Sequence, residues 1–148
     1  FILSASLILM ERFVDNGNDT VSDNTTGLTW LKKDSRQMLD KWIHLERSRA
    51  WANELNDKKF GGFIDWRVPE LKDVKTIFDR NYTNRARGND EIHIPSVFES
   101  GGADNTWTNT INGDRAMVYS LIKGRSSWIN KLGEGPFAVR LVRGEIKD

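Results

Sequence analysis

The sequence contains no cysteine and only two histidines among its 148 residues. The lack of cysteine excludes disulfide bonds, thiolate nucleophiles, cysteine-ligated zinc and iron–sulfur clusters. The two histidines, His44 and His93, lie far apart in the sequence and neither has neighbours at metal-ligand spacing. We therefore expect no histidine-based metal site and no cofactor.

An excess of charge of either sign is also missing, because 22 Lys and Arg residues face 21 Asp and Glu residues, a net charge of +1. Such a balance gives no field strong enough to indicate a nucleic-acid partner. One local cluster, formed by Arg80, Arg85 and Arg87, is interpreted as a solvated loop. We expect no nucleic-acid binding.

The common catalytic motifs are absent as well. No Gly-x-Ser-x-Gly elbow, phosphate-binding Walker loop or dinucleotide fingerprint occurs. Asp90 and Glu91, together with Asp104, have the chemistry of a glycosidase pair, but the sequence does not define the distance between them. We therefore expect that the protein is not an enzyme.

The chain begins with an apolar run, residues 1–10, which is too short to span a bilayer. Its length suits the hydrophobic part of a leader or an anchor remnant, which would associate with a membrane. A first strand or core segment is the alternative interpretation. Residues 11–148 have the length of a single domain, with no repeat and no linker.

The patterning of that domain predicts an α+β fold. Asn16-Gly17 predicts a hairpin turn because both residues tolerate positive φ, and residues 23–27 predict a second turn. Apolar spacings of three and four residues predict a helix over 40–55 and another after Pro69. A long loop is expected over 81–104, and further strands over 106–108, 116–122, 127–129 and 137–142.

Four blocks of sequence, in order between Arg12 and Gly144, resemble the Lcl C-terminal domain family of bacterial collagen-like adhesins. The resemblance implies a twisted antiparallel sheet with two helices and long irregular loops, similar to C-type lectins. It also implies an adhesive module, with polyanionic glycans among its ligands. The blocks are RFVDNGNDTVSDNTTGLTW (12–30), GGFIDWRVPEL (61–71), NTWTNT (105–110) and FAVRLVRG (137–144).

The sequence departs from the family pattern at three positions. The family often has cysteine at the positions of Ala52 and Leu141, and both cysteines are missing here. Their joint absence puts only a disulfide in doubt. Asp19 stands where the family has a turn glycine, which puts the conformation of that turn in doubt.

Two local motifs allow a structural and a functional interpretation. Asp65 and Arg67 flank Trp66, and we expect them to form a buried ion pair with Trp66 packed between the sheet and the second helix. A ligand contact by Trp66 and Arg67 is the alternative interpretation. The acidic loop between Asp15 and Asp23 offers oxygen ligands for calcium, but it lacks the spacing of an EF-hand. Turn formation explains the same residues, so no metal site is predicted.

Polar and aromatic side chains suited to a carbohydrate follow one another between residues 105 and 130. Alternate residues of a strand share a face, so Asn105, Trp107 and Asn109 are expected on the same face. A core position for Trp107 is the competing interpretation. The expected ligand-binding residues are Asn105, Trp107, Asn109, Asn112, Asp114, Arg115, Trp128 and Asn130.

Two functions are consistent with these observations. The first is a periplasmic or extracellular binding module that recognises a glycan or another cell-surface polymer. The second is an accessory subunit that docks onto a larger membrane or surface protein assembly. A concave polar groove with exposed aromatic residues favours the first, whereas a flat apolar patch larger than a few hundred Å² favours the second.

Overall fold

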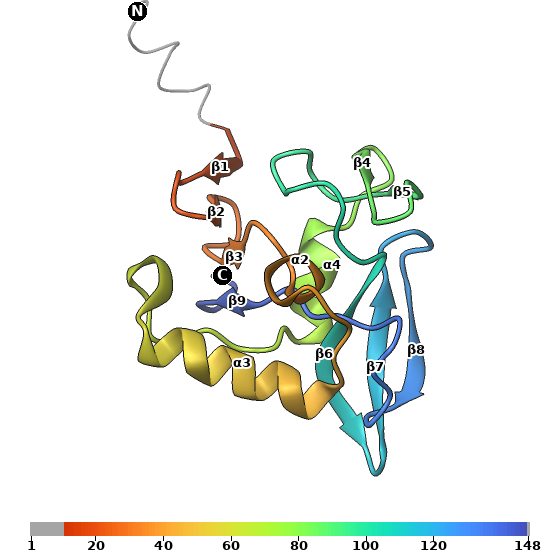
Figure 1. Ribbon diagram of the computed structural model, residues 1–148. Coiled ribbons are helices and arrows are strands. Elements are labelled where there is room, and N and C mark those ends of the chain that lie inside the picture. The colour runs from red at the N-terminus through yellow and green to blue at the C-terminus, as the bar shows by residue number, and fades with distance from the viewer. Residues whose placement is uncertain (1–10, 148) are drawn as a thin grey trace, which may run out of the picture.

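The computed structural model describes residues 11–147 (Figure 1). The interpretations of residues 1–10 as a leader, an anchor or a first strand lie outside the described residues. No helix among residues 11–147 is both long and apolar enough to cross a membrane.

The first sheet joins the two ends of the described chain. Its strands follow the order β1-β2-β3-β9, so that the last strand pairs with one of the earliest. The turn predicted at Asn16-Gly17 is confirmed, since Gly17 has a φ of 80° and the Asn16 N–H bonds to the Thr20 carbonyl. The strands are β1 (Phe13–Asp15), β2 (Thr20–Asp23), β3 (Thr29–Leu31) and β9 (Val142–Arg143).

The helices are α2 (Ser35–Leu39), α3 (Leu45–Asp57) and α4 (Leu71–Ile77), with a 3-10 turn η1 (Phe60–Gly62). The predicted start of α3 at residue 40 is five residues too early. Asp40 instead ends α2 in the left-handed conformation, and His44 caps α3 by accepting the Arg47 N–H. The short helix α2 was not expected from the sequence.

The second sheet is a three-stranded meander with the order β6-β7-β8. The expected loop over 81–104 also contains a small hairpin and buries Ile92, Ile94 and Phe98 in the core, so it is a packed segment. The strand expected over 137–142 is mostly irregular. The strands of the small hairpin are β4 (Asn84–Arg85) and β5 (Glu91–Ile92). The strands of the meander are β6 (Asn105–Asn112), β7 (Arg115–Ser120) and β8 (Arg125–Asn130).

The α+β class is confirmed, with three antiparallel sheets and three α-helices in the described residues. Cross-strand pairing places Trp107 and Val118 on one face of the β6–β8 sheet, and both join a core cluster with residues of α3. Tyr119 lies on the other face and packs edge-on against Phe78, next to α4. The two faces of this sheet therefore serve two different core clusters, while similarity to C-type lectins stays a prediction.

The turn between β7 and β8 gives a direct test of this packing. Gly124 has a φ of 69°, and a Cβ atom there would clash with the ring of Phe78. We expect Gly124→Ala to lower the free energy of unfolding by about 2–4 kcal/mol, from backbone strain and overpacking together. Gly113 has a similar φ of 61° but open space around it, so Gly113→Ala should cost only about 1–2 kcal/mol. Equal losses in denaturant unfolding would contradict the proposed contact.

Candidate functional site

The expected ion pair between Asp65 and Arg67 is wrong. Asp65 accepts two hydrogen bonds of 3.0 Å from Arg143, and Arg67 donates to buried Asp73 at 2.7 Å and to the Gly144 carbonyl. The cause is an antiparallel bridge between Arg67 and Val142, which brings the end of the chain beside this segment. Asp65, Arg67 and Arg143 therefore stabilise the fold through these contacts.

Trp66, between those two residues, is buried as expected but against different elements. Its indole N–H bonds to the Phe60 carbonyl, and its ring meets Phe60 and Phe63 edge-on. Its backbone N–H and carbonyl are both held by the side chain of Asn56 on α3. Trp66 thus fixes the end of α3 and η1, and not the start of α4.

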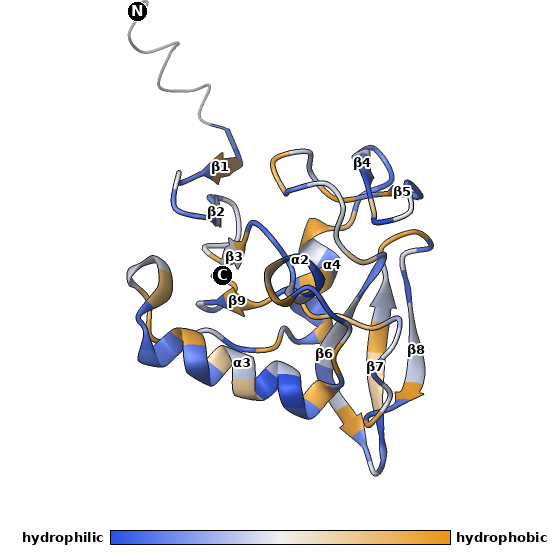
Figure 2. Ribbon diagram, in the orientation of Figure 1, coloured by the Kyte–Doolittle hydropathy of each residue, from blue (hydrophilic) through white to orange (hydrophobic). Residues whose placement is uncertain are grey.

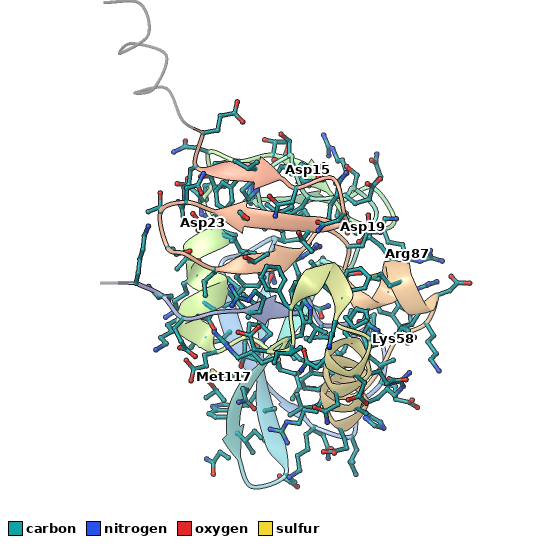
Figure 3. The ribbon with its side chains drawn as sticks, turned by 90° about the vertical axis from the view of Figure 1, so that its left-hand side faces the viewer. Asp15, Asp19, Asp23, Lys58, Arg87 and Met117 are labelled. Carbon is teal, nitrogen blue, oxygen red and sulfur yellow. The ribbon has the colours of Figure 1, made fainter. Side chains whose placement is uncertain are left out.

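The acidic loop between Asp15 and Asp23 forms no shared cation site. Asp15 pairs with Lys32, Asp19 lies 3.9 Å from Lys33, and Asp23 makes a two-pronged pair with Arg12. Figure 3 shows Asp23 at the other end of β2 from Asp19. In residues 11–147 no group of three His, Asp or Glu side chains gathers as a metal site.

The buried carboxyl of Asp23 is held by several hydrogen-bond donors at once. Burial raises the pKa of its carboxyl, but hydrogen bonds from Arg12, Thr26 and the Thr25 N–H outweigh burial and hold the pKa below its usual value. The carboxylate is therefore charged, and both of its oxygens accept hydrogen bonds from protein groups. It organises the second turn, which the sequence predicted.

Two of the expected ligand residues are part of the core. Trp107 has no exposed surface, and its indole N–H bonds to the Ile43 carbonyl at 2.9 Å. Asn105 is also buried, and its side-chain amide donates to the Pro136 carbonyl. A direct ligand contact by Trp107 is therefore ruled out in this conformation, because no atom of its ring reaches the surface.

Asn109 is exposed, and it does not share a face with those two residues. The β6–β7 register shifts between Trp107 and Ile111, so β6 carries a bulge of extra residues there. Within the bulge, the Asn109 N–H bonds to the Pro69 carbonyl and its side-chain oxygen accepts from Arg49 at 2.8 Å. The bulge thus turns Asn109 toward α3 and the segment before α4.

The remaining expected residues gather at the far end of the β6–β8 sheet. Asn112, Arg115 and Asn130 form one cross-strand row, and Trp128 pairs with Met117 in the next row of the same face. Figure 3 shows Met117 on the outer part of this sheet. Asp114 lies in the adjoining turn. These five residues form one surface, and Asn109 belongs to another.

That other surface is a groove along the outer side of α3, past the β6 bulge, to the start of α4. Three hollows of about 170, 280 and 460 Å³ follow one another, the first two sharing Arg49 and the last two sharing Asn109. Figure 2 shows polar residues along much of α3. We call this feature the α3–α4 groove; its polar lining residues are Glu46, Arg49, Asn53, Arg67, Glu70, Lys72, Lys75, Asn109, Thr110 and Lys131.

The groove offers mainly hydrogen-bond donors. Five of its lining side chains are cationic and two, Glu46 and Glu70, are acidic. Arg67 is neutralised by Asp73, which is fully buried beneath it. Apart from Asn109 and Arg67, the sequence did not indicate this set, because its members come from four separate segments with no motif in common.

Comparison with protein-family models gives one match, the Lcl C-terminal domain, over residues 19–143. The chain belongs to the Lcl C-terminal domain family. No curated protein and no solved structure matched the chain. Membership of the family suggests an adhesin-like, surface-associated domain.

The three departures of this Lcl C-terminal domain from its family pattern lie in two kinds of place, the core and an exposed turn. Ala52 and Leu141, at the positions where cysteine was expected, are both buried in the same hydrophobic cluster. Asp19 keeps a turn-like φ of 65°, so it adopts the conformation for which the family uses glycine. The domain therefore accommodates the replacements by apolar packing and by a residue tolerant of positive φ.

Proposed function

We propose that this domain is a non-enzymatic, extracytoplasmic binding module that holds a glycan chain in the α3–α4 groove. The supporting observation is the run of three neighbouring hollows, each of which shares a lining residue with the next. An extended polymer fits such a run because successive units occupy successive hollows. The hydrogen bond between Arg49 and Asn109 crosses the middle of the groove.

The groove favours a glycan that carries carboxylate or sulfate groups. Lys72, Lys75 and Lys131 extend from its two ends, and only Lys72 has a lining acid, Glu70, within 4 Å. Arg49 lies 3.9 Å from Glu46, whose side chain is largely exposed, so that attraction is screened by water. The amides of Asn53 and Asn109 supply neutral partners for hydroxyl groups.

The alternative function, docking onto a larger assembly, has less support in the described residues. Their exposed large apolar side chains are scattered over several elements: Val14, Ile64, Ile111, Trp128 and Leu132. Single exposed apolar residues are normal on protein surfaces and define no flat patch. The concave polar groove therefore favours the glycan-binding function.

A glycan array that includes sulfated and uronic-acid polysaccharides tests this proposal. We expect saturable binding that Asn109→Ala weakens about tenfold, because the substitution removes one ligand bond and releases Arg49. Binding should be the same with and without calcium, given the paired carboxylates of the acidic loop.

Asn112→Ala is the matched control, since Asn112 is an exposed asparagine on the same strand outside the groove. Its affinity should equal that of the unaltered protein. Binding that Asn112→Ala weakens and Asn109→Ala leaves unchanged would move the site to the far end of the sheet. An array with no binding at all would contradict the proposed function.

A further inference from the structure

The β7–β8 hairpin carries charge of one sign only. Residues 115–131 contain four cations, Arg115, Lys123, Arg125 and Lys131, and no acidic residue. None of the four forms an ion pair with a carboxylate in residues 11–147. Asp114, in the turn beside Arg115 and Lys131, offsets one of these charges, and the overall charge balance of the chain hides the remaining local excess.

The same hairpin has an open edge. β8 pairs only with β7, and Figure 1 shows it at the outer side of its sheet with no other element beyond it. Among the described residues, the backbone groups of residues 125–129 bond to β7 and to no other segment. The strand is therefore free to accept a further strand along five residues, 125–129.

The strand lacks the features that usually protect such an edge. It has no proline, and its central residues, Ser126 to Ile129, carry no charge. Trp128, in the centre, is 38% exposed beside Met117. The cations lie at the two ends instead, with Lys123 and Arg125 at one end and Arg115 and Lys131 at the other.

This arrangement determines the kind of partner. A second copy of the hairpin would bring two sets of four positive charges together, which disfavours self-association. A polyanionic glycan would satisfy the charges but could not pair with the regular row of backbone N–H and carbonyl groups. An extended polypeptide with acidic ends and an apolar centre satisfies both requirements.

We propose that the β8 edge is a docking site for an extended, acidic polypeptide segment, which adds as a fourth strand to the β6–β8 sheet. Backbone hydrogen bonds to residues 125–129 supply the affinity. An apolar side chain of the partner covers Trp128, and acidic residues at its ends meet Arg125 and Arg115. This site shares only Lys131 with the residues that line the α3–α4 groove, and it does not depend on glycan binding.

The test uses a capped peptide of alternating valine and threonine with glutamate at both ends. We expect its titration to shift the amide resonances of β8 in nuclear magnetic resonance spectra and to protect them from hydrogen exchange. Reversing Lys123 and Arg125 to glutamate should weaken binding roughly fivefold per charge. The groove resonances of Asn53 and Asn109 should not move.

Two control ligands separate strand addition from charge alone. The same peptide with every backbone nitrogen methylated keeps its charges but has no N–H donor left on either edge, so it should not bind. A sulfated oligosaccharide should leave the β8 amides unshifted. Equal binding by the methylated peptide, a response of β8 to the oligosaccharide, or no binding of the acidic peptide would each overturn the proposal.

Discussion

Asp34→Ala is expected to lower the free energy of unfolding by about 3–5 kcal/mol, because it leaves a buried cation without its counter-charge. Asp34 and Arg140 are each only 2% exposed, and their charged groups lie 3.9 Å apart. Burial lowers the pKa of Arg140, and the carboxylate of Asp34 opposes that effect. Asp34 also accepts N–H groups from Gln37 and Ala103, tying α2 to the segment before β6.

The variant Arg140→Met separates the loss of charge from the loss of those hydrogen bonds. The carboxylate of Asp34 keeps its two backbone donors in this variant, so we expect a smaller loss of about 1–3 kcal/mol. The double variant with both Asp34→Ala and Arg140→Met should then unfold at a higher denaturant concentration than Asp34→Ala alone. Strictly additive losses in this cycle would show that the two charges do not interact.

Trp107→Ala is expected to cost about 3–5 kcal/mol of unfolding free energy. The ring is fully buried, lies 5.2 Å from that of Phe137 between centroids, and donates its N–H to the chain just before α3. Removing it leaves a large cavity in the cluster that joins α3 to the β6–β8 sheet. Thermal unfolding, followed by circular dichroism, measures the loss.

Trp128→Ala is the matched control in the same sheet. Trp128 is partly exposed on β8, so its removal should change the stability by about 0.5 kcal/mol or less. A similar loss from both substitutions would contradict the assignment of Trp107 to the core. The pair also serves as a stability control for the glycan experiment, because weak binding by Trp107→Ala would reflect unfolding and not a missing ligand contact.

Local features of the fold were predictable because their causes are local. The turn at Asn16-Gly17 follows from backbone preferences of two residues, and α3 follows from apolar spacing within one segment. The capping pair Asp34 and Gln37 marks the start of α2 in the sequence, although a helix of five residues shows too few turns for periodicity to reveal it.

The partners of charged residues were not predictable, because they lie far away in the chain. Asp65 pairs with Arg143, which is 78 positions further on, and no sequence spacing indicates this choice. The groove has the same origin, since α3, the start of α4 and the β6 bulge meet only after folding. A two-residue shift of register within β6 was enough to separate Asn109 from Trp107.

The place of the last residues in the core has a consequence for how the chain reaches its folded state. Val139, Leu141 and Val142 are completely buried, and they complete both hydrophobic clusters. A chain emerging from a ribosome or a translocation channel presents its N-terminal strands first, while these three residues are still enclosed. The domain therefore completes its folding only when nearly all of it has emerged. Until then the apolar residues of both clusters are accessible to chaperones and proteases.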